Sequence, residues 1–294
     1  MLRRALLLGL ASLPVAGCDR QTADKVAAGV DFATAMLDIT KRHGGRIGVS
    51  AIDAGSGARL SVSAQDRFGM MSVFKWILAA AVLARVDKGE LKLDQVVRYS
   101  AKDLIAYSPV TEKEVKDGRM AVGELCAATV SKSDNTAANL LLPLVGGPEG
   151  LTKWIRSLGD AVTRCDRKEP ELNVVAEGDP RDTTTPEAMT QLLQIVFSGA
   201  ALEADSIKQL RDWMEATSTG DKRIRAGVPS GWTVGNKTGT ANGAVNDVAV
   251  IWPKSEKTEG PIFLSIFTTG GALEADAKEQ VVADIARLVC EVFA

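Results

Sequence analysis

Ser72 and Lys75 stand three residues apart at the start of the apolar stretch MMSVFKWILAAAVLARV, residues 70–86. Side chains at this spacing share one face of a helix, so the hydroxyl and the amine are expected side by side at a helix N-terminus. A desolvated lysine has a lowered pKa and can accept a proton from a neighbouring hydroxyl. The alternative is that the Lys75 ammonium extends to the surface along its apolar stem. The pair is therefore a candidate nucleophile and base.

Two short motifs further along the chain carry polar groups that complement this pair. SDN occupies residues 133–135 between two predicted helices, and KTG occupies residues 237–239 on a predicted strand. Each has an ordinary structural explanation, a helix N-cap for the first and an exposed edge-strand lysine for the second. S-x-x-K alone is also weak, because a chain of this size contains about one by chance. Only their combination and order are informative.

A long loop is predicted at residues 164–186, RCDRKEPELNVVAEGDPRDTTTP, which have no sustained period and are rich in charge and proline. A structureless stretch of this length in a compact domain is usually functional or disordered. Because the segment combines Glu169, Asn173 and internally pairable charges, we expect an ordered loop that supplies functional groups. The alternative for Glu169 is an ordinary exposed carboxylate.

The chain contains a single histidine, His43, in KRHGGR. This context predicts a solvated helix end followed by glycines. A Ser-His-Asp or Cys-His hydrolase would need that histidine in its site. A hydrolase built from these motifs therefore needs a different base.

Hydrophobic periodicity places the motifs on a mixed architecture. Helical spacing covers residues 22–42 and a last helix covers 273–293, whereas residues 46–64 alternate on either side of GSG as in a hairpin. From residue 70 to about 215 the signals are mostly helical. The order helix, two strands, many helices, three strands, helix predicts one sheet assembled from both ends of the chain around an inserted helical domain. The last three predicted strands are GWTVGNKTGT, AVNDVAVIWP and PIFLSIFTT.

S-x-x-K, SDN and KTG, in this order on helix, loop and strand, form the signature of class A β-lactamases and penicillin-binding proteins. The sequence resembles a class A serine β-lactamase over residues 24–294. The resemblance implies a fold that is α/β plus all-α: a five-stranded antiparallel sheet flanked by N- and C-terminal helices, an inserted all-helical domain, and an active site between them. The matching blocks are YSPVTEK, SDNTAANLLL, DRKEPELN, GDPRDTTTP, RIRAGVPSGW, NKTGT and NDVAVIWP.

The resemblance also divides the chain. Residues 18–68 and 215–294 are expected to form a discontinuous α/β domain. Residues 69–214 are expected to form the helical domain, which includes the active-site loop at residues 164–182.

By resemblance, Ser72 opens the β-lactam ring of penicillins and cephalosporins and forms an acyl-enzyme, which gives antibiotic resistance. Lys75 and Glu169 are alternative bases for acylation, and Ser133 relays a proton to the departing nitrogen. A water activated by Glu169 then hydrolyses the acyl-enzyme. The backbone N–H groups of Ser72 and Thr240 form the oxyanion hole.

Further roles follow from the same resemblance. Asn135 binds the side-chain amide of the substrate, Tyr107 forms an apolar wall and Asn173 anchors the hydrolytic water. The substrate carboxylate is held by fixed donors and positive charge, with Arg223 rather than its neighbour Arg225 as the arginine. The complete expected binding set is Tyr107, Asn135, Asn173, Arg223, Lys237, Thr238, Gly239 and Thr240, and the loop is braced by Arg167, Pro170 (after a cis bond) and Asp182.

The sequence departs from many relatives at several positions. Val73 replaces a threonine that helps to brace the loop. Cys126 matches one half of a disulfide in many members, but the partner position holds Ala79. Met71 and Ala241 stand where dedicated carbapenemases carry a cysteine pair, which disfavours efficient carbapenem hydrolysis.

Three rival readings share parts of the pattern. A DD-peptidase or transpeptidase carries the same three motifs but does not need EPELN (169–173) for deacylation. A non-catalytic β-lactam sensor would acylate and stay acylated, normally beside a transmembrane segment. A generic serine esterase lacks support because the chain has neither a triad histidine nor G-x-S-x-G.

The N-terminal sequence MLRRALLLGLASLPVAGC predicts export. Residues 1–17 have a basic start and an apolar run too short to span a bilayer, as in a signal peptide. LPVAGC resembles a bacterial lipobox, so Cys18 is the expected lipidation site, and ordinary signal cleavage is the alternative. We therefore expect a periplasmic or exported protein anchored to the membrane through lipidated Cys18.

Composition excludes several other classes. The chain has 294 residues, 46% hydrophobic and 24% charged, with a net charge of −2, and no basic stripe with aromatics that would indicate nucleic-acid binding. Cys126, Cys165 and Cys290 show no CxxC spacing, so no metal site is predicted; an odd number predicts at least one free thiol. We expect a monomer without a cofactor.

Overall fold

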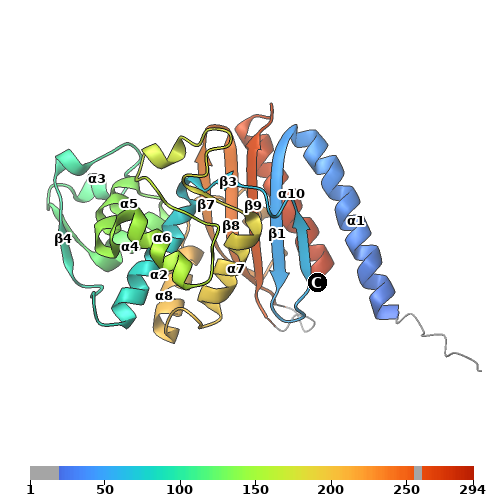
Figure 1. The fold of residues 1–294 in the computed structure, drawn as a ribbon, viewed down its shortest axis with the longest axis horizontal. Helices are drawn as coiled ribbons and strands as arrows, with labels where there is room; N and C mark the ends of the chain where they lie inside the picture. Colours follow the sequence, from blue (N-terminus) through green and yellow to red (C-terminus); the bar gives the residue numbers. More distant parts are fainter. Residues whose placement is uncertain (1–19, 255–259) are drawn as a thin grey trace, which may run out of the picture.

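The computed structural model describes residues 20–254 and 260–294. Its centre is a five-stranded antiparallel sheet with strand order β2-β1-β9-β8-β7, so that both ends of the chain contribute strands (Figure 1). The predicted fold class is confirmed. The strands are β1 (Gly45–Asp53), β2 (Arg59–Val62), β7 (Thr233–Ala241), β8 (Ala244–Trp252) and β9 (Ile262–Gly270).

Helices cover both faces of this sheet, which explains why β8 and β9 are buried along nearly their whole length. On one face pack α1 (Arg20–His43) and α10 (Ala275–Phe293), which lie together at one side of the molecule in Figure 1. Their apolar stripes and the inner sheet residues form one core cluster. On the other face α7 (Pro186–Phe197) packs against β1 and β9.

The helical part of the protein is built around α2 (Phe74–Asp87). Residues 74–84 of this helix are all buried, as expected for a helix that is apolar all round and lies in a core. The other helices of this part are α3 (Thr111–Glu114), α4 (Val122–Ser131), α5 (Asn135–Leu141), α6 (Gly147–Ser157) and α8 (Ala204–Glu215). The short helix α9 (Ile224–Gly227) packs instead against α10 and β8.

Short elements connect these helices to the sheet. There are two small two-stranded antiparallel sheets in the described residues. One pairs β3 (Phe68–Gly69) with β6 (Thr183–Thr184), and the other pairs β4 (Val96–Arg98) with β5 (Arg119–Ala121). The 3₁₀ turns are η1 (Met71–Val73), η2 (Ala101–Asp103), η3 (Leu142–Val145) and η4 (Glu171–Asn173).

One local prediction is wrong. His43 ends α1 as expected, but its side chain is buried at 1% exposure. Its Nδ1 accepts a hydrogen bond from the backbone N–H of Gly45, and the backbone at Gly271 lies against its ring. Burial, reinforced by the charge of Lys278, lowers the pKa of His43. The end of β9 covers this helix terminus, which a local sequence pattern does not reveal.

The N-terminal signal predicted at residues 1–17 and the lipidation site Cys18 lie outside the described residues. Within those residues, none of the helices combines the length and apolarity needed to cross a bilayer. The division into domains 18–68 with 215–294 and 69–214 stays a prediction, and α7 belongs to the second range although it packs on the sheet.

Candidate active site

Ser72 lies in η1, immediately before α2, and the turn is shaped by Met71 at a positive φ of 50°. Lys75 follows in the first turn of α2 and is fully buried at 0% exposure, so its side chain does not extend to the surface. Its Nζ donates to Ser72 Oγ at 3.1 Å and to the backbone oxygen of Ser133 at 2.7 Å. The Nζ atom also lies 3.1 Å from Glu169 Oε1. The amine therefore contacts Ser72, Ser133 and Glu169 at once.

Burial lowers the pKa of Lys75, and the Glu169 carboxylate acts in the opposite direction. A lowered pKa brings the neutral amine closer to neutral pH, where it can accept the hydroxyl proton. Lys237 is equally buried, and burial together with the charge of Lys75 lowers its pKa well below the usual value. Two fully buried lysines thus lie at the same site.

Ser133 sits between these two amines. Its Oγ lies 3.3 Å from Lys75 Nζ and 3.1 Å from Lys237 Nζ. The position is fixed because Asp134 caps α5: its Oδ1 accepts from the backbone N–H of Ala137 at 2.8 Å. Asn135 follows, and its Nδ2 donates to the Ala106 oxygen while its Oδ1 accepts from Lys75. The SDN motif is therefore both the predicted N-cap and a source of polar groups.

Strand β7 forms the opposite wall of the site. Gly239 allows the strand to approach η1 closely, because a Cβ there would lie 2.6 Å from the Met70 carbonyl oxygen. Thr238 shares a 2.8 Å hydroxyl contact with Thr219. Thr240 Oγ1 accepts from Arg223 Nη2 at 2.7 Å.

The loop at residues 164–182 places Glu169 beside Ser72. Glu169 is buried at 1% exposure, and its Oε1 accepts from Ser72 Oγ at 3.4 Å. Its Oε2 accepts from Asn173 Nδ2 at 2.6 Å. The backbone of Glu169 exchanges two hydrogen bonds with the Asn139 side chain. Hydrogen bonds therefore fix both oxygens of the Glu169 carboxylate as well as the backbone of this residue.

The neck of this loop is closed by an ion pair. Arg167 Nε lies 2.6 Å from Asp182 Oδ2, and Asp182 Oδ1 accepts from two backbone N–H groups of the opposite arm. The Glu169–Pro170 peptide bond is cis. The loop is thus ordered by internal polar contacts.

Arg223 and Arg225 have different surroundings. Arg223 is 7% exposed, and its guanidinium reaches Thr240, Glu279 and the Asn246 carbonyl. Arg225 instead bonds Asn236 and the C-terminal carbonyls of α8, away from the pocket. Only Arg223 of the two lines the site.

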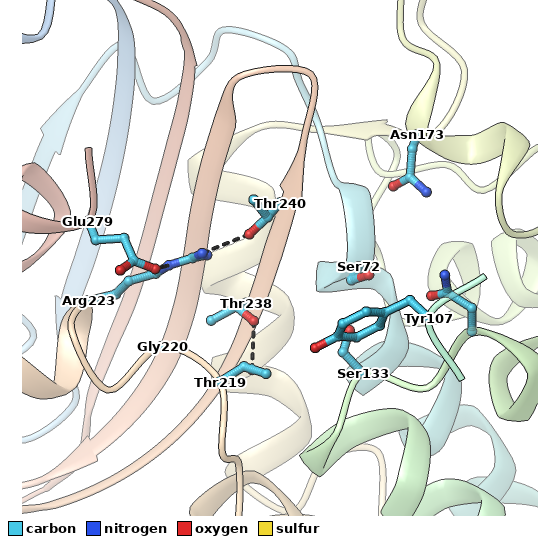
Figure 2. Close-up of a pocket in the computed structure, with 11 residues that line it drawn as sticks. Ser72, Tyr107, Ser133, Asn173, Thr219, Gly220, Arg223, Thr238, Thr240 and Glu279 are labelled. Atoms are coloured by element: carbon cyan, nitrogen blue, oxygen red, sulfur yellow. Dashed lines mark hydrogen bonds and ion pairs between the residues drawn. The ribbon is translucent and has the colours of Figure 1, made fainter. Parts of the chain in front are cut away.

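A pocket of about 500 Å³ lies between the helical part and the sheet (Figure 2). The buried Lys75, Glu169 and Lys237 do not line it, but they contact Ser72 and Ser133, which do. In Figure 2, Ser72, Tyr107, Ser133 and Asn173 face the β7 side, where Thr238, Thr240 and Arg223 lie. Tyr107 is 61% exposed and has a positive φ of 59°, so its ring stands at the mouth. The lining is completed by Asn135, Thr219, Gly220 and Glu279.

The sequence interpretation did not include Thr219, Gly220 and Glu279. The glycine was readable as part of a turn in TSTGDK, but nothing local linked that turn to β7. Glu279 stands 56 positions after its partner Arg223, and no short motif spans that separation.

The cysteines and possible metal ligands lie elsewhere. Cys126, Cys165 and Cys290 are buried free thiols, and burial raises the pKa of each of them. No cluster of three metal-ligating side chains occurs in the part of the chain that the structure describes.

A buried lysine and glutamate on one serine hydroxyl, at the junction of an antiparallel sheet and a helical region, characterise a serine hydrolase without a histidine base. The family model described as "Beta-lactamase enzyme family" matches residues 31–293. The chain belongs to the class A β-lactamase family and is an enzyme that hydrolyses the cyclic amide of β-lactams.

Individual relatives agree with this assignment. The "Carbapenem-hydrolyzing beta-lactamase KPC" of Klebsiella oxytoca is 45% identical over 98% of this chain and 96% of its own length. "Beta-lactamase FAR-1" of Nocardia farcinica is 47% identical over 85% of this chain and 79% of its own length. A solved β-lactamase from Xanthomonas campestris has a TM-score of 0.88 and 43% identity, covering 91% of this chain and 99% of that structure.

Proposed function

We propose that this protein hydrolyses penicillins and cephalosporins through an acyl-enzyme on Ser72, and so confers resistance to them. Ser72 Oγ attacks the lactam carbonyl carbon, the C–N bond breaks, and the serine proton passes to Lys75 or Glu169. The departing nitrogen receives a proton through Ser133. Water then attacks the ester, Glu169 takes its proton, and Ser72 is regenerated as the ring-opened acid leaves.

One observation carries this proposal. Ser72 Oγ lies 3.1 Å from Lys75 Nζ and 3.4 Å from Glu169 Oε1, so that a nucleophile and two proton acceptors share one hydrogen-bonding cluster. With a β-lactam, a penicillin-binding protein completes only the first half-reaction and stays acylated. The Glu169 carboxylate, held by Asn173, supports a second, hydrolytic half-reaction.

The other groups have roles consistent with their positions. Ser133, between Lys75 and Lys237, can pass a proton between an amine and the leaving nitrogen. The backbone N–H groups of Ser72 and Thr240 are proposed as the oxyanion hole, a type of site that is typically worth about 3 kcal/mol per donor.

The substrate is proposed to contact both the β7 wall and the helical wall of the pocket. The carboxylate of the β-lactam binds on the β7 side, at Lys237, Thr238, Thr240 and Arg223, with Gly239 permitting the close approach of the strand. Asn135 binds the amide of the acylamino side chain and Tyr107 covers it.

Export is proposed from the sequence alone, with lipidation of Cys18 and a monomeric mature enzyme. Intact-mass analysis of the mature protein from a bacterial membrane fraction tests this, since diacylation adds the mass of the lipid to Cys18. An unmodified Cys18 in that fraction would contradict it.

Carbapenem hydrolysis is a second candidate, because one relative that is 45% identical over 98% of this chain is named for that activity. Against it, Met71 and Ala241 cannot form a disulfide. Steady-state kinetics with one penicillin, one oxyimino-cephalosporin and one carbapenem separate the two candidates.

The first test is turnover of a chromogenic cephalosporin by the purified mature protein. We expect many turnovers per enzyme molecule, because Glu169 completes the hydrolytic step. A stoichiometric burst followed by silence would instead indicate a sensor or a peptidase.

The second test is Glu169→Gln. The amide cannot take a proton from water, so a penicillin should acylate Ser72 and remain attached, with a loss of at least 100-fold in kcat, as is typical of general-base removal. Mass spectrometry detects the adduct. Glu171→Gln, an exposed neighbour two residues on, is the matched control and should turn over normally; normal turnover in Glu169→Gln would remove Glu169 from its role.

A further inference from the structure

Asn246 in β8 lies at the point where β8 and β9 stop pairing. The register between these strands ends at Asp247 and Ile266. Beyond it, the side-chain amide of Asn246 replaces the backbone ladder, because its Oδ1 accepts from the backbone N–H of Thr268 at 3.0 Å. Asn246 is fully buried, so both ends of the amide need partners within the protein.

The other end of this amide reaches the segment that carries the nucleophile. Asn246 Nδ2 donates to the backbone oxygen of Gly69 at 2.9 Å, across 177 positions of sequence. Gly69 ends β3 and precedes Ser72 by three residues. The backbone N–H of the next residue, Met70, donates to the Asp182 oxygen at 3.0 Å. The chain that enters η1 is therefore held by the sheet and by the active-site loop.

The turn needs such support because of Met71. This residue has a positive φ of 50°, a conformation that is strained for a bulky side chain and persists only where the surrounding structure holds it. The Gly69 carbonyl lies only two residues before the strained position. Loss of the hydrogen bond from Asn246 would let the strain relax through movement of the chain at Ser72.

Asn246 and Gly239 act on this segment together. The two residues are direct partners in the β7–β8 register, so they share one face of the sheet. Gly239 leaves room for the Met70 carbonyl, and Asn246 binds the Gly69 carbonyl. Thr240 follows Gly239 and carries one N–H of the proposed oxyanion hole. The spacing between the two N–H donors of that hole therefore depends on how η1 docks against β7 and β8.

The backbone of Asn246 serves a different group. Its carbonyl oxygen accepts from Arg223 Nη1 at 2.9 Å. Substitution of the Asn246 side chain leaves that carbonyl in place, so Arg223 keeps this partner. An effect of the side chain on the reacting serine can thus be separated from an effect on the proposed carboxylate-binding arginine.

We propose that Asn246 is a positioning residue for the oxyanion hole: its hydrogen bond to the Gly69 carbonyl holds η1 against the sheet, so that the N–H groups of Ser72 and Thr240 keep the spacing that a tetrahedral intermediate needs. This inference rests on the proposed function. Asn246 does not touch the substrate and acts through residues 69–71. Donors stabilise an oxyanion only when they are in place before its charge develops, and a displacement of about 1 Å can cost about 100-fold in rate.

The first test is Asn246→Ala in the full chain, with one penicillin as substrate. The Gly69 carbonyl loses its donor, so kcat should fall about tenfold or more, whereas KM should stay within about twofold because Arg223 keeps its carbonyl partner. Inhibition by a boronic acid, which forms a tetrahedral adduct on Ser72, should weaken by a similar factor, since such an adduct needs the same two donors. An unchanged kcat would overturn the proposal.

The matched control is Thr190→Val. Thr190 is also fully buried, and its Oγ1 joins α7 to β1 by donating to the Ser50 carbonyl at 3.0 Å, away from Ser72. Both variants lose a buried hydrogen bond and should lower the thermal unfolding temperature, but only Asn246→Ala should lower kcat. An equal fall in kcat in Thr190→Val would show a general effect of lost stability and would overturn the positioning role.

Asn246→Asp tests the donor itself with little change of shape. The carboxylate keeps an acceptor for the Thr268 N–H but has no donor for the Gly69 carbonyl, whereas the protonated acid regains an O–H donor. Relative to wild type at each pH, kcat should be low at about pH 8 and should recover toward about pH 5.5, because burial favours the neutral acid. A variant that remains impaired at the lower pH would contradict the proposal. Failure of the wild-type protein to turn over penicillin would instead refute the proposed function.

Discussion

Arg223 illustrates how single side chains are held in this site. Its Nε, Nη1 and Nη2 atoms donate to Glu279, to the Asn246 carbonyl and to Thr240 respectively. A planar guanidinium with these fixed acceptors has one orientation. Glu279 thus positions the charge that is proposed to receive the substrate carboxylate, although it also neutralises part of that charge.

These two effects of Glu279 can be separated by mutation. Glu279→Leu removes the acceptor, so Arg223 loses its orientation and KM for a penicillin should rise about three- to tenfold, less than a full charged hydrogen bond because the pair is partly exposed. Glu279→Gln keeps an acceptor oxygen and removes the charge, so KM should stay near the wild-type value or fall. Steady-state kinetics with a single penicillin measure both; a rise in KM of equal size in the two variants would show that charge, rather than orientation, is what matters.

Residues within one short motif were predictable, whereas those joined over long distances were not. The spacing of Ser72 and Lys75 is a property of one helical turn, and the cap at Asp134 is equally local. Glu279 depends on its contact with Arg223 across 56 positions, and Asn242 depends on its hydrogen bond to the Asn173 carbonyl across 69 positions. The burial of His43 depends on β9, so the expected solvated helix end could not be corrected from KRHGGR.

At the scale of elements, the site depends on how closely β7 approaches the turn that carries Ser72. Gly239 permits that approach, since a Cβ would meet the Met70 carbonyl oxygen at 2.6 Å. The sequence pattern predicted β7 as a strand, and predicted Ser72 and Lys75 on one helix where the structure has η1 followed by α2. The distance between them follows from packing of the sheet edge on the helical region, which no periodic pattern encodes.

Gly239→Ala should therefore impair catalysis more than folding. The clash is with backbone, so β7 and η1 must separate, and displacement of Thr240 relative to Ser72 should lower kcat/KM by about tenfold or more. Gly235→Ala on the same strand is the matched control: its Cβ would meet Met214 Cβ at 3.1 Å, away from Ser72. Kinetics together with thermal unfolding should show an activity loss for position 239 and chiefly a stability loss for position 235.

For the molecule as a whole, one buried carboxyl makes stability depend on pH. Asp247 in β8 is fully buried beneath the site, where it accepts from Asn236 Nδ2 at 2.9 Å. Burial raises its pKa to about 6, from 3.8, against the influence of Arg223. Between these two values the folded protein binds more protons than the unfolded chain, so this group lowers the free energy of unfolding as pH rises from about 4 to about 6.

Asp247→Asn removes that proton uptake. Relative to the variant, the wild-type protein should be more stable at about pH 4.5 than at about pH 7, because its carboxyl is protonated only in the folded state at the lower pH. Denaturant unfolding at both pH values measures the difference, with Asp31→Asn on the exposed side of α1 as the control. A difference that does not change with pH would contradict the raised pKa.

The pairing of β1 with β9 joins Asp53 to Ile262 and Gly45 to Gly270. During synthesis, the early β1–β2 hairpin consequently keeps an open edge while about two hundred further residues are made. Closing so long a loop is slow, and the unpaired edge is exposed to other chains until it closes. β7, which carries the proposed substrate-binding groups, is joined to β1 only through β8 and β9. The central five-stranded sheet can therefore be completed only after residue 270 has been made.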